Sequence, residues 1–357
     1  MDRRAFLATG LAAAASPALA EQRQGGFVVD TLAIGGPGSV EGRKTLAAGI
    51  DAMVLDMTIF PRAPAEAAQT LQRWNAYEAG PDADTLIIRT GGDFQRARAM
   101  GKVGVVIACQ DASILGPSSI SYSDQPLDIL RQHHAAGLRV LQLTHNERNG
   151  YGDGFMEPHD GGLSMAGAAV IRQMNALGGV IDLSHCSELT TLEAIRASDK
   201  PVAITHSGCR ALYPSLRNKT DEAIRLLADR GGYFGVFMMS RWLTDRPTAS
   251  VDDVVDHIDH AVKLAGVGAV GFGSDQPAPG DARPQAEKVA ALAAYQARNL
   301  GRAGAEPLHG HTTCADMDGL HRMSVLAEAL KRRGYGSSDR DGILGENFRR
   351  FFGQLTA

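Results

Sequence analysis

The stretch VIDLSHCSELTTLEAIRASDKPVAITH, residues 180–206, contains two short apolar runs that flank a helical segment. The apolar residues of each run are nearly continuous, which is typical of strands buried on both faces of a parallel sheet. Between the runs, Ser187 precedes Glu188 as a helix N-cap, and apolar residues follow at three-to-four spacing. Because the runs end in His185 and His206, this strand–helix–strand unit is predicted to bring two imidazoles to one edge of a sheet.

The same alternation extends over the rest of the chain. Eight runs are predicted as strands: Phe27–Leu32, Ala52–Met57, Val103–Cys109, Arg139–Thr144, Val180–Ser184, Val202–Thr205, Tyr233–Phe237 and Ala269–Gly273. Helices are predicted between them, among them Ser164–Leu177, Ser187–Ala197, Asp221–Ala228 and Val251–Leu264. Eight strand–helix repeats predict an α/β fold, a (β/α)8 TIM barrel in a single domain. The polar, alanine-rich segment 277–313 is expected to be an insertion or a lid beside the barrel mouth.

The first twenty residues contain the three parts of an export signal. Arg3 and Arg4 precede an apolar run, and the small residues Ala18 and Ala20 follow it. The run is too short for a membrane span, and paired arginines indicate the twin-arginine route, although an ordinary amphipathic helix is the alternative. The predicted division is a signal at 1–20 and a barrel at 21–357, with a periplasmic location.

Charge and cysteine content exclude some functions. The formal net charge is −4 and the lysines and arginines are dispersed, so nucleic acid is not an expected partner. The four cysteines form no Cys-x-x-Cys pair. Cys186 and Cys209 lie close in sequence to the two histidines, so they could form a disulfide, add a metal ligand or simply be buried small side chains.

The candidate chemistry lies at the carboxyl ends of the predicted strands, where barrel enzymes place their working groups. His145, His185 and His206 each follow a strand, and Asp275 follows the last one. Two imidazoles on neighbouring strands can share one zinc ion. Asp275 can serve as a ligand or as a proton-transfer carboxylate. A structural hydrogen-bonding role is the alternative for each histidine, and a turn cap is the alternative for Asp275.

Several blocks of sequence resemble the renal, or membrane, dipeptidase family of metallo-dependent hydrolases. In family order they are GLRVLQLTHN (137–146), MNALG (174–178), IDLSH (181–185), ITHS (204–207), Arg217-Asn218, GFGSD (271–275) and ILGENFRR (343–350). The blocks span nearly the whole mature chain. The resemblance implies a barrel enzyme that hydrolyses dipeptides.

Carried over residue by residue, the resemblance implies His185 and His206 as ligands of one metal ion. It places Asp275 beside the attacking water and His145 near the substrate, where an imidazole would stabilise the oxyanion. Arg217 matches the arginine that contacts the substrate carboxylate, a contact that a guanidinium can make with two hydrogen bonds. A surface ion pair is the alternative for Arg217.

The sequence departs from the family at the ligands of the second metal. The family holds that ion with Asp-x-His-x-Asp at the end of strand one and with a bridging glutamate at the end of strand three. Here Leu32 and Ile34 stand in the first motif, and Gln110 stands in place of the glutamate. Leu32 and Ile34 have no donor atoms, and a neutral amide does not offset the repulsion between two cations. We therefore expect one zinc ion rather than two, with a metal-free protein as the alternative.

Two further assignments follow from these departures. Gln110 and Asn218 are assigned to substrate binding together with Arg217. Asp30 or Asp111 could supply an oxygen ligand in an alternative register if either side chain turned inward, although side-chain direction is fixed along a strand.

Three functions remain open on the sequence. The first is a metallohydrolase of dipeptides or small amides. The second is a periplasmic tailoring or maturation protein for a peptide-like metabolite, and the third is a non-catalytic barrel that binds carboxylates. All three predict a small peptide-like ligand and no membrane span after signal removal, and a homodimer is left open.

Overall fold

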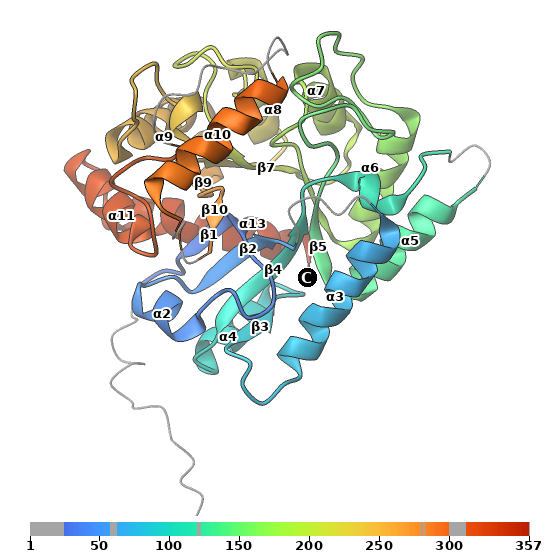
Figure 1. Ribbon diagram of the computed structural model, residues 1–357, viewed down its shortest axis with the longest axis horizontal. Helices are drawn as coiled ribbons and strands as arrows, with labels where there is room; N and C mark the ends of the chain where they lie inside the picture. Colours follow the sequence, from blue (N-terminus) through green and yellow to red (C-terminus); the bar gives the residue numbers. More distant parts are fainter. Residues whose placement is uncertain are drawn as a thin grey trace, which may run out of the picture.

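The computed structural model describes residues 25–57, 63–119, 123–278, 280, 283–299 and 312–356. Within these ranges eight parallel strands pair in sequence order around a barrel, with the helices outside them (Figure 1). The strands are β1 (Val29–Ile34), β2 (Ala52–Asp56), β4 (Val103–Cys109), β5 (Leu138–Gln142), β6 (Val180–Asp182), β7 (Ala203–Ser207), β8 (Tyr233–Val236) and β9 (Val270–Phe272). Each one overlaps a predicted strand, so the prediction of a single-domain TIM barrel is confirmed.

A two-residue strand joins the last strand of the barrel to the first. β10 (Gln276–Pro277) follows β9 closely and pairs in parallel with β1, with Ala33 opposite Gln276. The Asp275 N–H also donates to the Leu32 carbonyl at 2.9 Å. Because β10 continues the course of β9, these contacts close the sheet.

Side chains cap several of the helices that surround the strands. The described helices are α2 (Gly42–Ala47), α3 (Pro64–Glu78), α4 (Gly92–Ala99), α5 (Gln125–Ala135), α6 (Met165–Leu177), α7 (Glu188–Ala197), α8 (Asp221–Asp229), α9 (Val251–Ala265), α10 (Gln285–Asn299), α11 (Arg322–Arg332), α12 (Ser337–Asp341) and α13 (Asn347–Leu355). Ser164, Ser187 and Thr220 cap α6, α7 and α8 by accepting a backbone N–H. Gly178 ends α6 in the left-handed conformation at φ 72°, directly after the predicted last residue of this helix, Leu177.

Side chains alternate along the strands between two apolar clusters. Residues such as Leu55, Ile107 and Leu141 pack against the helices. Their neighbours, such as Val54 and Val140, form the barrel interior together with the phenylalanines of α13. Since the side-chain period of a strand is two, the residues that follow two positions later also point into the barrel, and near the carboxyl ends of the strands they form a polar layer. That layer contains Asp56, Gln110, Gln142 and Asp182, all buried.

Some sequence predictions need correction or lie outside the described residues. The first strand begins at Val29 rather than Phe27, and its pairing with β2 shifts register between Asp30 and Ala33. A short strand β3 (Thr85–Ile87) was missed; among the strands that the structure describes it pairs with β4, off the barrel path. Segment 277–313 contains helix α10, but parts of it, like the predicted signal at 1–20, are outside the described ranges. Of the helices described, none combines the length and apolarity that a membrane crossing requires.

Candidate metal centre

Two imidazoles meet at the mouth of the barrel. His185 follows β6, His206 lies in β7, and their Nε2 atoms are 3.0 Å apart. Both side chains are buried. The carboxylate of Asp275 joins them, since one ligand atom from each of the three residues lies within 4.8 Å of the other two. The structure therefore brings together the three strand-end residues that the sequence proposes for metal chemistry.

His145 completes a group of three imidazoles. Its ring stacks on that of His185 with centroids 4.2 Å apart and an interplanar angle of 22°. Burial, reinforced by the positive charge of Arg217, lowers the pKa of His145 to about 3. The same two causes, burial first, hold the pKa values of His185 and His206 well below the ordinary range. All three rings are therefore neutral at pH 7, which is the form that binds metal ions.

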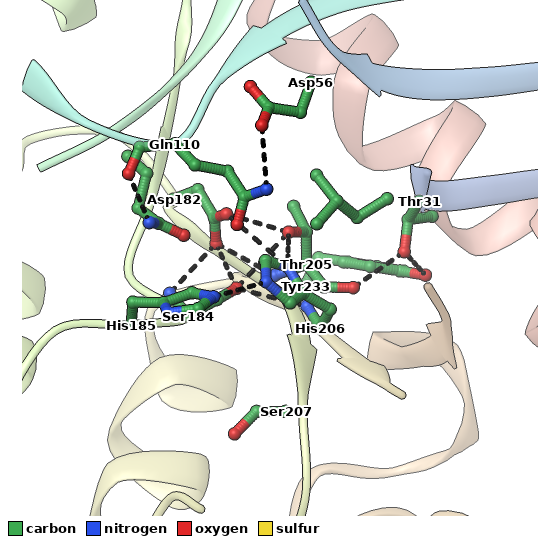
Figure 2. A network of polar contacts seen from close by, with 12 residues as sticks. Thr31, Asp56, Gln110, Asp182, Ser184, His185, Thr205, His206, Ser207 and Tyr233 are labelled. Atoms are coloured by element: carbon green, nitrogen blue, oxygen red, sulfur yellow. Dashed lines mark hydrogen bonds and ion pairs between the residues drawn. The ribbon is translucent and has the colours of Figure 1, made fainter. Parts of the chain in front are cut away.

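The outer ring nitrogens of the buried pair are engaged by side-chain oxygens. His185 Nδ1 lies 2.8 Å from Asn146 Oδ1. His206 Nδ1 lies 2.8 Å from Thr205 Oγ1 (Figure 2). These contacts orient both rings so that the Nε2 atoms face each other. Ligand histidines in metalloproteins are oriented by contacts of this kind.

Asp275 has an unusual backbone conformation. Its φ of 56° lies in the left-handed region, which aspartate tolerates better than most residues. The conformation is fixed by two hydrogen bonds, from the Asp275 N–H to the Leu32 carbonyl and from the Ser274 N–H to Asp30 Oδ1. Burial raises the pKa of Asp275 to about 6, against the opposing effect of Arg217 and Arg241. The side chain is only partly covered, so it stands at the entrance to the site.

Arg217 and Asn218 lie deeper than a surface loop would place them. The Arg217 guanidinium is fully buried and donates to the carbonyls of Ser184 and His206, at 2.7 and 2.9 Å. The Asn218 amide nitrogen donates to the carbonyls of Tyr213 and Trp242. Both side chains thus brace the backbone around the histidine pair, and the surface ion pair considered for Arg217 is wrong. Their contact with a substrate stays a prediction.

Gln110 belongs to the polar layer beneath the histidines. Its side-chain amide nitrogen donates to Asp56 Oδ2 at 3.0 Å (Figure 2). The side-chain amide nitrogen of Gln142 donates to the backbone carbonyl of Gln110. These donors fix the orientation of both amides. Among the described residues, the buried side-chain oxygens of Gln110 and Gln142 have no hydrogen-bond partner. Since an unpaired buried acceptor is costly, each oxygen is suited to receive a donor from a ligand or from water.

The acidic residues nearest the altered positions have other partners. Asp30 forms an ion pair with Arg322, with Oδ2 and Nε 2.9 Å apart and both side chains fully buried. Asp111 caps the 3-10 turn at Ala112–Leu115 and accepts a hydrogen bond from Asn149. The idea that Asp30 or Asp111 turns inward as a replacement ligand is therefore wrong, because their hydrogen bonds hold both in structural roles.

The cysteines are buried free thiols. Cys186 Sγ lies 3.3 Å from the Thr144 hydroxyl, and Cys209 Sγ donates to the His257 carbonyl at 3.4 Å. Of the three alternatives, the structure favours buried small side chains over a disulfide or an extra ligand.

Sequence reasoning did not single out two residues of this site. Asp182 and Thr205 stand directly behind the histidine pair and connect to it by hydrogen bonds. The available signal was an aspartate inside an otherwise apolar strand, since a buried carboxylate needs several donors.

Comparisons with known proteins agree with this geometry. Residues 39–295 match the family described as membrane dipeptidase (Peptidase family M19). Dipeptidase aclJ of Aspergillus oryzae is 35% identical over 168 residues, which are 46% of this chain and 40% of that protein, so the match spans less than half of either.

Two solved structures share the fold. An amidohydrolase from Pseudomonas aeruginosa superposes with a TM-score of 0.78 at 24% identity, covering 96% of this chain and 99% of that one. A metallo peptidase from Rhodobacter sphaeroides, bound to a phosphinate mimic of the dipeptide L-Ala-D-Ala, superposes with a TM-score of 0.70 at 19% identity, covering 92% and 99%. At these identities the likeness speaks for the fold alone. The family match extends over well more than half of the chain, and the chain therefore belongs to the membrane dipeptidase family.

Proposed function

We propose that this protein is a dipeptidase-like metallohydrolase that cleaves dipeptides or small amides with one zinc ion bound by His185 and His206. The observation that carries the proposal is the 3.0 Å approach of the two Nε2 atoms beside the Asp275 carboxylate. Zinc–nitrogen bonds of about 2.0–2.1 Å place two ligands of one ion roughly 2.9–3.4 Å apart, so the pair fits this metal. Neutral imidazoles and a partly exposed carboxylate are also the donor set that a catalytic zinc site uses.

The remaining residues supply proton transfer and charge stabilisation. A bound zinc ion would contribute Lewis-acid polarisation of the scissile carbonyl. Asp275, with its pKa raised to about 6, takes a proton from the attacking water and returns it to the leaving amine. His145, held neutral by burial and Arg217, donates an N–H hydrogen bond to the developing oxyanion.

Substrate recognition uses the two ends of a dipeptide. The carboxylate binds near Arg217 and Asn218. The positive charge of Arg217 reaches the entrance of the site, where it partly opposes the larger effect of burial, which raises the pKa of Asp275. The amino end lies toward Gln110, whose side-chain oxygen has no partner in the described part of the chain and can accept an N–H. A neutral amide acceptor at this position replaces the charged bridging glutamate of the family pattern.

Metal analysis of the purified protein combined with a dipeptide hydrolysis assay tests the proposal. We expect one zinc ion per chain and turnover, with both lost in His185→Ala and kept in His159→Ala, which changes an exposed histidine. Two bound ions with turnover would show that the second site survives. A protein with neither metal nor turnover would favour the carboxylate-binding barrel, and zinc with turnover of larger peptide-like compounds only would favour the tailoring protein.

We also propose that the chain is exported to the periplasm by the twin-arginine route. The support is the Arg3-Arg4 pair, the apolar run and the small residues before position 21. Replacing both arginines with lysine should retain the protein in the cytoplasmic fraction. Unchanged periplasmic recovery of that variant would contradict this route.

A further inference from the structure

A buried carboxylate lies behind the histidine pair, and every hydrogen bond on it is one that it accepts. Asp182 Oδ1 receives the Ser184 N–H at 3.1 Å, the Ser184 hydroxyl at 2.6 Å and the Thr205 N–H at 3.0 Å. Asp182 Oδ2 receives the Thr205 hydroxyl at 2.8 Å. Figure 2 shows these contacts converging between the two strands that carry the histidines.

These contacts decide which nitrogen of His206 carries the proton. The Thr205 hydroxyl has one hydrogen, and it is directed at Asp182 Oδ2. Thr205 Oγ1 can therefore only accept from His206 Nδ1, 2.8 Å away, so the ring proton of neutral His206 lies on Nδ1. Its Nε2 then presents a lone pair to the site. His185 Nδ1 also faces an acceptor, Asn146 Oδ1, so neutral His185 carries its proton on Nδ1 as well. Neither Nε2 atom then has a hydrogen to donate, and the 3.0 Å separation between them suits a shared cation.

The same carboxylate also sets the distance between the strands. β6 and β7 share one register pair, Asp182 with Ala203. Beyond that pair, side chains replace backbone partners: the Thr205 N–H donates to Asp182, and the His206 N–H donates to the Ser184 hydroxyl at 3.1 Å. Asp182 thus links β6 to β7 shortly before the two imidazoles, since it lies three residues before His185 and binds Thr205, the residue before His206.

We propose that Asp182 is a positioning residue that acts through Thr205 to fix the Nδ1–H tautomer of His206 and, through Ser184 and Thr205, the spacing of the two Nε2 atoms. The inference rests on the proposed metal-binding function, which it deepens. Asp182 touches neither substrate nor ion. It prepares the chain for a cation that binds imidazole nitrogen, before any such ion arrives.

Asp182→Asn is the sharpest test, because it keeps the shape and changes one atom from acceptor to donor. The asparagine nitrogen would donate to Thr205 Oγ1, so the hydroxyl would turn toward His206 Nδ1 and the ring proton would move to Nε2. We expect nitrogen-15 NMR of the folded, metal-free chain to report an Nδ1–H His206 in the parent and an Nε2–H His206 in the variant. We expect zinc affinity, measured by competition with a chromophoric chelator, to fall about 10- to 100-fold.

Thr205 supplies a matched pair that decides the question if Asp182→Asn does not fold. Thr205→Ser keeps the hydroxyl and should keep both the tautomer and the zinc affinity. Thr205→Val keeps the shape without the hydroxyl and should lose both. Asp252→Asn, at an exposed position on α9, is the control for charge alone.

An Nδ1–H His206 in both Asp182→Asn and Thr205→Val, with zinc affinity within two-fold of the parent, would overturn the proposal. The NMR measurement needs neither metal nor turnover. A parent protein that binds no zinc would therefore refute the proposed function while the tautomer result still decides the role of Asp182.

Discussion

The buried ion pair between Asp30 and Arg322 provides a quantitative test of how the barrel is closed. The pair joins β1 to the start of α11, and both side chains are fully inaccessible to solvent. Asp30 also accepts the N–H of Ser274, the residue before Asp275. Arg322→Met removes the cation, keeps a side chain of similar length and leaves a carboxylate buried without its charged partner.

The expected loss is large for a single substitution. Breaking one side of a buried ion pair costs about 3–5 kcal/mol, because the remaining charge stays desolvated. With an unfolding entropy of about 2.1 cal/mol/K per residue, a chain of this length should lose roughly 4–7 °C in Tm. The double variant Asp30→Asn/Arg322→Met removes both charges, and we expect it to recover at least half of the lost free energy.

Chemical denaturation of the parent, both single variants and the double variant measures the coupling directly. We expect a coupling free energy of about 2 kcal/mol or more between the two positions. Arg322→Met should also weaken zinc binding, because Asp30 holds the backbone beside Asp275. A coupling below about 1 kcal/mol would refute the argument that the buried charges depend on each other.

Three shorter predictions concern neighbouring groups. Burial lowers the pKa of His257 below its unfolded-state value of about 6.5. The neutral ring therefore stabilises the fold above pH 6.5, and this stability is lost as the pH falls. His257→Gln should make the free energy of unfolding, measured by urea melts between pH 7 and 5, less pH-dependent by at most about 1.4 kcal/mol per pH unit. Asp275→Asn should abolish dipeptide turnover with little loss of Tm, because it removes the proton-transfer carboxylate. Asp275→Val should lose both turnover and stability, because a β-branched residue at φ 56° costs about 1–3 kcal/mol; equal melting of the two variants would contradict this. Gln110→Glu should lower the Tm at pH 7 more than at pH 5, because an ionised glutamate would replace the amide that donates to Asp56 and would repel that carboxylate. Metal analysis of this variant should find no second ion.

The features that the sequence predicted are those that depend on local pattern and on barrel topology. The apolar runs identify the strands, and parallel strands in a closed barrel bring their carboxyl ends together. His185, His206 and Asp275 could therefore be grouped without any knowledge of their contacts. Local pattern also located the N-cap Ser187, because a cap involves residues within one turn.

The features that the sequence did not predict depend on contacts between distant segments or on single hydrogen atoms. Asp30 and Arg322 are 292 positions apart, and nothing local indicates that they pair. The contact of Arg217 with a substrate stays a prediction, but the sequence did not indicate that its two Nη atoms donate to backbone carbonyls beside the histidines. The role of Asp182 depends on the direction of the Thr205 hydroxyl, which follows only from the complete set of donors around the carboxylate.

Leu32 and Gln110, the positions where the resemblance leads us to expect replaced metal ligands, are each compatible with their neighbours in the barrel interior. Leu32 is fully buried in the interior cluster with Val29 and Val54, so apolar packing occupies the place where the family pattern has a ligand. Gln110 is compatible with Asp56 at 3.0 Å because an amide can donate to a carboxylate, whereas two carboxylates at that distance would not both be ionised. A neutral side chain at 110 and an apolar one at 32 therefore support each other, since restoring either ligand alone would introduce a polar or charged group without the cation that offsets it.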